Sequence, residues 1–197
     1  MAKVHPAAEA PVSDSCNMSS AGRETFTIWM KSLVCHTNGC TVFDSKGDIL
    51  YRVENYDSKG SSEVHLMGLR GKILFTILKR KLQIFGCWNG YKGSFTGTKK
   101  EKPCFQVKKY CSILRRDSAC QVTVGLNKYG IVSLGHKKKG FKIVDLDGDT
   151  VAEVKQKQLS SGTVLGVDVL TLEVEPYIDH SLIVAPVTVY GLINRRL

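Results

Sequence analysis

The 197-residue sequence lacks both a secretory leader and a long hydrophobic run. Its first 16 residues contain no apolar core of the kind found in signal peptides. The longest apolar run, Leu182–Ile193, covers 12 residues, whereas a membrane-spanning helix needs roughly 20. These absences predict a soluble intracellular protein without a transmembrane span. The expected compartment is the cytoplasm, and peripheral attachment to a membrane is left open.

The sequence also lacks the short motifs of common catalytic sites. It contains no G-x-S-x-G nucleophile elbow, no phosphate-binding P-loop and no dinucleotide fingerprint. No nucleophile motif stands beside any of the five histidines, His5, His36, His65, His136 and His180. The pattern therefore favours a binding protein over an enzyme and implies no cofactor.

Metal-ligand spacings are scarce as well. The seven cysteines are an odd number, and no C-x-x-C pair is present to complete a tetrahedral zinc site. Cys35, His36 and Cys40 are three soft ligands close together, but buried reduced thiols are the expected role for such cysteines. The aspartates of Asp145–Asp149 alternate as calcium ligands do, yet Gly148 is fourth where an EF-hand needs glycine sixth. We therefore expect a hairpin turn here and no metal site.

Acidic residues are nearly absent from the middle of the chain. Between Arg70 and Lys142 there are 18 Lys and Arg against two acids, Glu101 and Asp117. The rest of the chain has 10 basic and 16 acidic residues, so the net charge of +10 is concentrated in this middle region. Such an asymmetry predicts a positive surface. The plain alternative is a solvated lysine face without a partner.

What the sequence does contain is a series of short strands. Residues 1–23 are rich in Ala, Pro and Ser without an apolar period, and they are predicted to be a disordered tail before one domain at 24–197. From Thr25 onward, short apolar or alternating runs recur at the spacing of a β-sandwich or barrel. The predicted strands are 25–30, 40–44, 48–54, 63–67, 72–77, 82–88, 104–110, 120–126, 131–135, 140–145, 150–157 and 164–174.

Similar turns separate several of these strands. Asp44–Asp48 and Asp145–Asp149 both begin with Asp and have Gly as the fourth residue, and Leu69–Lys72 is a looser third copy. The Asp side chain accepts hydrogen bonds from its own turn, and glycine adopts a positive φ at low cost. The repetition indicates hairpins in two related halves. A chance match of common turn sequences is the alternative.

The chain ends in a segment that is apolar on every side. Pro176 ends the preceding strand, Asp179 is a candidate helix cap, and Ser181–Asn194 follows. A helix that is apolar all round must be buried, and this one is too short to span a membrane. Its Val, Thr, Pro and Gly residues are poor helix formers, so one or two buried strands are the local alternative.

Four blocks of the sequence carry a family resemblance: TFTIWMKSLV at Thr25–Val34, GCTVFDSKGDILYRVENY at Gly39–Tyr56, Leu69–Gly93, and DVLTLEVEP at Asp168–Pro176. They resemble the plant LURP-one-related proteins over residues 24–197. The resemblance implies a mostly β, tubby-like fold, in which a closed antiparallel β-barrel of about twelve strands encloses a hydrophobic C-terminal helix. Closure removes sheet edges, and the helix fills a lumen too wide for side chains alone.

The same resemblance bears on function only loosely. The family is named for a plant protein linked to defence, and its relatives in fold include phosphoinositide-binding tubby proteins and phospholipid scramblases. A fold does not carry a function with it. Scramblases have an acidic calcium segment before the C-terminal helix, whereas the stretch LSSGTV at 159–164 contains no carboxylate. A scramblase-like transporter is therefore the weakest of the alternatives.

Clusters of Lys and Arg are the candidates for an anion-binding surface. Because neighbouring residues in a strand point to opposite faces, we expect these clusters at strand ends and in loops. If they converge, they fit phosphoinositides, acidic membrane lipid or an acidic protein. The candidate residues are Lys79, Arg80, Lys81, Lys99, Lys100, Lys108, Lys109, Arg115, Arg116, Lys137, Lys138 and Lys139.

Nucleic acid is the alternative partner for the same basic surface. Aromatic residues between the clusters are candidates for stacking on bases, although in a barrel they more often belong to the core. They are Phe85, Trp88, Tyr91, Phe105 and Tyr110. The sequence does not determine the oligomeric state.

Overall fold

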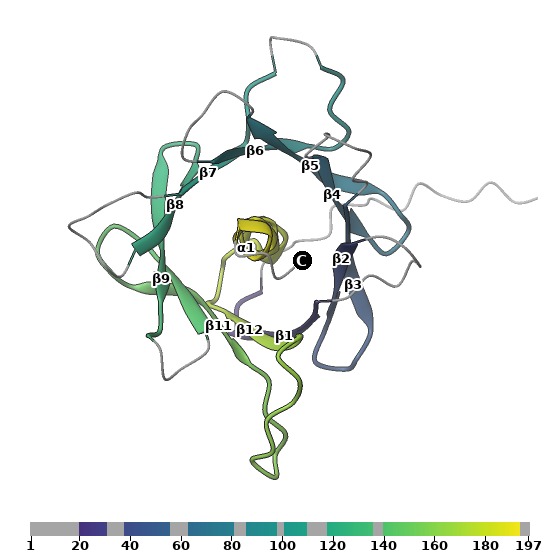
Figure 1. Ribbon diagram of the computed structural model, residues 1–197, viewed down its shortest axis with the longest axis vertical. Coiled ribbons are helices and arrows are strands. Elements are labelled where there is room, and N and C mark those ends of the chain that lie inside the picture. Colours follow the sequence, from purple (N-terminus) through teal and green to yellow (C-terminus); the bar gives the residue numbers. More distant parts are fainter. Residues whose placement is uncertain are drawn as a thin grey trace, which may run out of the picture.

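Short strands with alternating apolar side chains close into a β-barrel around a helix in the computed structural model, which describes residues 20–30, 38–55, 63–80, 86–97, 101–109, 118–135 and 140–193 (Figure 1). The twelve strands are β1 Glu24–Trp29, β2 Asn38–Phe43, β3 Ile49–Asn55, β4 Glu63–Gly68, β5 Ile73–Arg80, β6 Cys87–Lys92, β7 Phe105–Lys109, β8 Ser118–Val124, β9 Asn127–Ser133, β10 Gly140–Val144, β11 Thr150–Gln156 and β12 Val169–Val174. The helix is α1, His180–Ile193.

The barrel is an antiparallel meander that closes on itself. Each strand pairs with the next one in the chain, and β12 pairs with β1 from Glu24↔Val174 to Trp29↔Val169. Closure pairs the backbone groups that an open sheet would leave at its two edges. The predicted closed barrel around a C-terminal helix is confirmed, and its relation to the tubby proteins stays a prediction.

Most predicted strands are confirmed within a few residues, but two are displaced. The strand predicted at 82–88 is found at Cys87–Lys92, where the inward positions are Trp88 and Gly90. A side chain at Gly90 would collide with the ring of Phe105 on β7, so glycine occupies a core position that an apolar pattern misses. The strand predicted at 164–174 is shortened to β12, because residues 157–168 form a hairpin of their own.

The repeated turns have the predicted geometry. Asp44 Oδ1 accepts hydrogen bonds from the amides of Lys46 and Asp48, both at 2.8 Å. In the second copy Asp145 Oδ1 accepts them from Asp147 and Asp149 at 3.0 and 2.9 Å. Gly47, Gly148 and Gly71 of the three copies have φ of 91°, 92° and 73°. A register shift also lies beside each turn, at Phe43, Val144 and Met67.

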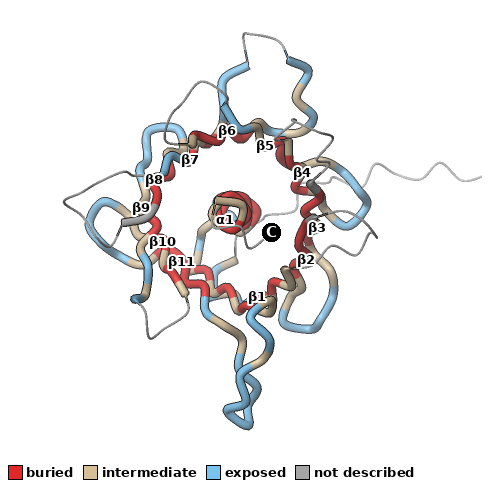
Figure 2. The backbone as a smooth tube through the Cα atoms, viewed as in Figure 1, coloured by how far each residue is buried: buried red, intermediate tan, exposed pale blue. Residues whose placement is uncertain are grey.

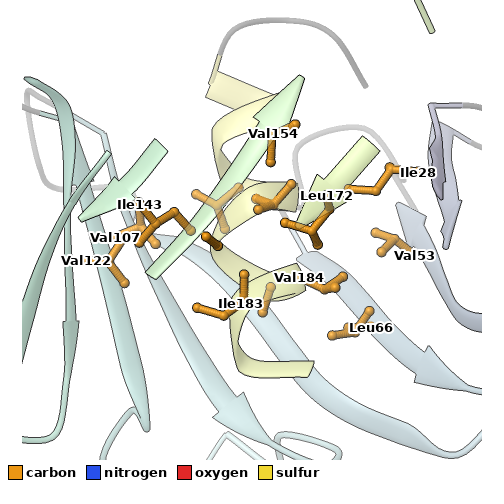
Figure 3. Close-up of a cluster of buried hydrophobic side chains, with 14 of the residues drawn as sticks. Ile28, Val53, Leu66, Val107, Val122, Ile143, Val154, Leu172, Ile183 and Val184 are labelled. Carbon is orange, nitrogen blue, oxygen red and sulfur yellow. The ribbon is translucent and has the colours of Figure 1, made fainter. Parts of the chain in front are cut away.

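α1 passes through the barrel with its apolar residues buried on all sides (Figure 2). Ile183 and Val184 pack among inward side chains from opposite parts of the wall, including Leu66, Val107 and Leu172 (Figure 3). Asp179 caps the helix, since its Oδ1 accepts from the Ser181 amide at 2.9 Å and the Leu182 amide at 3.3 Å. The predicted helix and its cap are confirmed, and the alternative of buried strands is wrong.

The direction of α1 distinguishes the two ends of the barrel. Its first residue, His180, lies 2.7 Å through Nδ1 from the Tyr51 hydroxyl near the start of β3. Its last turns reach the start of β10, where the Tyr190 ring lies 4.4 Å from that of Phe141. We call the first the capped end, which contains the starts of odd-numbered strands, and the second the exit end, which contains the starts of even-numbered strands.

β1 begins at Glu24, and the division into a tail at 1–23 and one domain at 24–197 stays a prediction. Residues 1–19 of the predicted tail lie outside the described residues, so its disorder stays a prediction. In the described part of the tail, the Ser20 carbonyl accepts a hydrogen bond from the Tyr177 amide at 2.8 Å. In the part of the chain that the structure describes, no helix is long and apolar enough to cross a membrane.

A charge inside the lumen should unfold the barrel. Val184 is 1% exposed, so the carboxylate of Val184→Asp would be buried without a partner. We expect the free energy of unfolding to fall by about 3–5 kcal/mol, measured by denaturant titration followed by circular dichroism. Leu126→Asp, at a turn residue that is 99% exposed, should change it by less than about 0.5 kcal/mol. Equal stabilities of the two variants would contradict a buried plug.

His180, the first residue of α1, should make the stability of the protein depend on pH. Burial lowers the pKa of His180 below its usual 6.5, and the charges of Glu24 and Asp179 only partly oppose this. Below about pH 6.5 the unfolded chain therefore binds a proton that the folded protein still lacks, and the free energy of unfolding decreases as the pH falls. Denaturant titrations at about pH 7.5 and about pH 5.5 should show a smaller difference for His180→Gln than for the wild type. An equal difference would exclude this role.

Candidate anion-binding surface

Two pairs of basic residues end the strands β5 and β7, which lie on either side of β6, at the exit end. Lys79 and Arg80 are the last residues of β5, and Lys108 and Lys109 are the last residues of β7. All four are exposed. The expectation that such pairs lie at strand ends is confirmed for both. We call these four residues the exit-end basic site.

Each pair has one side chain on the outer wall and one at the rim of the lumen. Arg80 pairs with Cys87 of β6, which pairs in turn with Lys108, so the three share the outer face. Lys79 and Lys109 have the same orientation as the inward residues Ile77 and Val107, two positions earlier on their strands. The site therefore extends around the end of the wall, from its outer face to its rim.

Aromatic and sulfur groups lie beneath these cations. Lys79 Nζ lies 5.9 Å from the ring centroid of Trp88, a cation–π distance. Burial raises the pKa of the Cys87 thiol, and the positive charges of Lys108 and Arg80 partly oppose that rise. Burial likewise raises the pKa of Cys120 to about 11, against the charge of Lys109. These thiols remain protonated at neutral pH and serve as packing groups beside the cations.

An amide network adjoins the outer part of the site. Gln106 Nε2 donates to Asn89 Oδ1 at 2.8 Å, and Asn89 Nδ2 donates to the Tyr91 hydroxyl at 3.4 Å. Tyr91 stacks on Phe95, with the ring centroids 4.1 Å apart. This polar face on the outer side of β6 and β7 carries no charge of its own. Sequence analysis missed it, because only the strand register brings Asn89 beside Gln106.

Several cations elsewhere in the described residues are paired with carboxylates. Glu153 on β11 lies 2.7 Å from Lys155 and 3.8 Å from Lys142. Arg52 likewise pairs with Glu54, and Arg23 lies 2.8 Å from Glu175. By contrast, no carboxylate of the described residues lies within ion-pair distance of the four cations of the exit-end basic site. Their positive potential is therefore not cancelled locally.

The remaining predicted site residues lie outside the described residues. They are Lys81, Lys99, Lys100, Arg115, Arg116, Lys137, Lys138 and Lys139. Most belong to connections that start and finish at strand ends of the exit end. Lys99 and Lys100 belong instead to the connection from β6 to β7, which starts and finishes at the capped end. The topology therefore attaches the basic clusters to two different ends of the barrel.

The described part of the chain offers little for metal binding. It contains no group of three or more His, Cys, Asp or Glu side chains that could hold an ion. Cys35 and His36 lie outside it, while burial raises the pKa of Cys40 to about 12, which opposes the thiolate that zinc requires. Asp145 is already occupied by the amides of its own turn, so the predicted hairpin turn is confirmed there.

The predicted stacking aromatics lie mostly in the core. Trp88 and Phe105 are 7% and 1% exposed, and Phe105 packs edge-on against Phe75. Tyr91 is half-buried. Phe85 and Tyr110 lie outside the described residues. The described aromatics therefore present few open faces for nucleic-acid bases.

Comparison with known proteins places this barrel in a family. A family model described as LURP-one-related matches residues 24–191. The chain is 52% identical to Protein LURP-one-related 4 of Arabidopsis thaliana, over 98% of this chain and 87% of that protein. It is 46% identical to Protein LURP-one-related 3 of the same plant, over 89% of this chain and 82% of that protein. Neither of these names refers to a reaction.

A solved structure supports the fold independently. The X-ray structure of a protein from Arabidopsis thaliana superposes with a TM-score of 0.64 over 90% of this chain and 94% of that one, at 15% identity. At that identity the likeness concerns the fold alone. The sequence matches carry the assignment, and the chain belongs to the LURP-one-related family.

Proposed function

We propose that this protein is a non-enzymatic binding module whose exit end attaches to anionic membrane lipid, phosphoinositides included. The observation that carries the proposal is the exit-end basic site, whose four exposed cations have no carboxylate partner in the described residues. Each Lys or Arg near an anionic membrane contributes about 1 kcal/mol of attraction. A role in plant defence, which the family resemblance suggests, belongs to the same proposal.

Chain connectivity supports this choice of end. By sequence, the six connections that join strands at the exit end contain nine Lys or Arg and three Asp or Glu. The six at the capped end, including the one to α1, contain six Lys or Arg and eight Asp or Glu. An anionic surface is therefore attracted to one end and repelled by the other.

A lipid surface fits the described site better than nucleic acid does. Binding of single strands relies on exposed aromatic faces for stacking, and Trp88 and Phe105 are buried. Clustered phosphates of a head group need only convergent donors, which Arg80 and Lys108 supply on either side of Cys87. An acidic protein partner would use the same cations, and nucleic acid is the alternative function.

Two chemical observations support a binding role without catalysis. The described thiols near the site have raised pKa values, so they are poor nucleophiles. Calcium-driven lipid scrambling lacks its carboxylates, since residues 158–167 carry no charge. We expect no calcium-dependent lipid movement in reconstituted vesicles, and dye-labelled lipid accessible from outside should stay constant when calcium is added.

Neutralising the outer cations should weaken vesicle binding. Arg80→Gln with Lys108→Gln removes two charges, worth about 2 kcal/mol, so the apparent Kd for vesicles containing phosphoinositide should rise about 30-fold. Co-sedimentation with phosphatidylcholine vesicles, with and without the phosphoinositide, measures it. Lys46→Gln with Lys128→Gln makes the same charge change toward the capped end, where both residues are exposed, and should have little effect.

Two further measurements separate the alternatives. Binding to anionic vesicles should fall as salt is raised, because exposed charges are screened beyond about 8–10 Å at physiological ionic strength. A gel-shift titration with a single-stranded oligonucleotide tests the nucleic-acid alternative. The proposed function would be refuted if the protein bound the oligonucleotide but no vesicles. It would also be refuted if the two double variants lost equal affinity for vesicles.

A further inference from the structure

Residues 157–168 form a hairpin that extends outward from the barrel wall between β11 and β12 (Figure 1). The ladder continues past the barrel, with the Lys157 amide donating to the Val169 carbonyl and the Leu165 amide donating to the Lys157 carbonyl, both at 2.9 Å. Near the tip, the Leu159 amide donates to the Thr163 carbonyl at 2.9 Å. Gly162, with φ of 81°, closes the turn. The hairpin is therefore an ordered extension of the sheet.

Hydrogen bonds to β1 and β11 hold the base of this hairpin. Trp29 Nε1 donates to Asp168 Oδ2 at 3.4 Å, and Lys157 Nζ donates to the Thr27 hydroxyl. Gln156 Nε2 donates to the Leu165 carbonyl at 2.8 Å. The two charged residues of the hairpin are thus engaged at its base, and these bonds join the base to the barrel wall.

The outer part of the hairpin is uncharged and apolar. From position 158 to 167 the sequence is QLSSGTVLGV, without one ionisable side chain. Leu159, Val164 and Val167 are 47%, 48% and 69% exposed. Exposed aliphatic side chains on a segment with no charge enter the head-group region of a bilayer at low desolvation cost.

The hairpin belongs to the same end of the barrel as the cations. It joins the last residue of β11 to the first residue of β12, both at the exit end, where the exit-end basic site also lies. The cations lie on β5 and β7, across the barrel from β11 and β12 (Figure 1). A flat anionic surface that faces the exit end would lie next to the strand ends from which both features begin.

We propose that the β11–β12 hairpin inserts Leu159, Val164 and Val167 into the membrane that the exit-end basic site attracts. This inference rests on the proposed function and adds an apolar anchor to it. Electrostatic attraction alone is weakened by salt, and stable attachment of a peripheral protein generally combines charge with apolar insertion. The hairpin supplies the second contribution.

Two exposed apolar side chains at the capped end, Leu146 and Leu126, fit a membrane less well. Leu146 lies between Asp145 and Asp147 in the β10–β11 turn, so anionic lipid would repel its surroundings. Leu126 is 99% exposed but stands alone at the tip of a two-residue turn. It provides a matched control, because it is at least as exposed as the hairpin residues and lies at the opposite end of the barrel.

The first test removes the apolar side chains. Leu159→Ser, Val164→Ser and Val167→Ser together should weaken binding to phosphatidylcholine–phosphatidylserine vesicles by about tenfold or more, from the apolar area no longer buried. Binding of the soluble inositol trisphosphate head group should stay unchanged, because it depends on the cations. Leu126→Ser should bind vesicles as the wild type does.

The second test reports insertion directly. Val164→Trp should be quenched by brominated lipid in the same vesicles, beyond the quenching seen for the wild type with its two tryptophans. Leu126→Trp should show no such gain. Both variants change exposed positions and should keep the wild-type circular dichroism spectrum.

The outcomes separate this inference from the proposed function. The hairpin anchor would be overturned if the triple serine variant still bound vesicles, or if a tryptophan were quenched at position 126 and not at 164. The charge variants would still test the exit-end basic site in that case. Loss of head-group binding in the triple variant would also count against the hairpin anchor, since the three substituted residues are uncharged. Wild-type protein that binds an acidic protein but no vesicle would refute both.

Discussion

The fold depends on filling the lumen of a closed twelve-stranded barrel. Pairing β12 with β1 leaves no exposed sheet edge, but a ring of this size encloses more space than its own inward side chains occupy. α1 supplies the missing apolar volume through residues such as Ile183, Val184 and Val189. The dependence is mutual: a helix of Val, Thr, Pro and Gly is unstable by itself, and a barrel without it would contain a large cavity.

The same architecture separates charge between two ends. In an antiparallel meander, connections alternate from one end to the other, so the summed charge of the connections can differ between the two ends. Basic pairs at the ends of β5 and β7 remain without carboxylates, while Lys142 and Lys155 on the wall share Glu153. The two unpaired basic pairs make the exit end a candidate binding surface, and the β11–β12 hairpin, whose outer part is uncharged, joins two strands at that end.

Much of this fold could be predicted from local patterns. Asp and Gly spacing predicted the turns at Gly47 and Gly148, because the side-chain hydrogen bonds and positive φ are local properties. The apolar C-terminal segment predicted a buried element, and the family resemblance identified it as a helix. The pattern failed at β6, where Gly90 faces the core to admit Phe105, and at residues 164–168, where apolar residues face solvent on a hairpin. At Gly90 the residue type depends on Phe105, which is distant in sequence, and on the hairpin the apolar side chains have no packing partner that a pattern could indicate.

By itself, then, the sequence determined the strands, their turns, the buried C-terminal segment and the concentration of positive charge between Arg70 and Lys142. Each of these follows from local composition and periodicity. Only the tertiary structure decided which charges lie at the same end of the barrel. That depends on whether a connection follows an odd-numbered or an even-numbered strand of the meander. The tertiary structure separated Lys79 and Lys108 from the connection that contains Lys99, and it placed the β11–β12 hairpin at the same end as the exit-end basic site. Strand register, which no local pattern encodes, brought Arg80 and Lys108 to either side of Cys87.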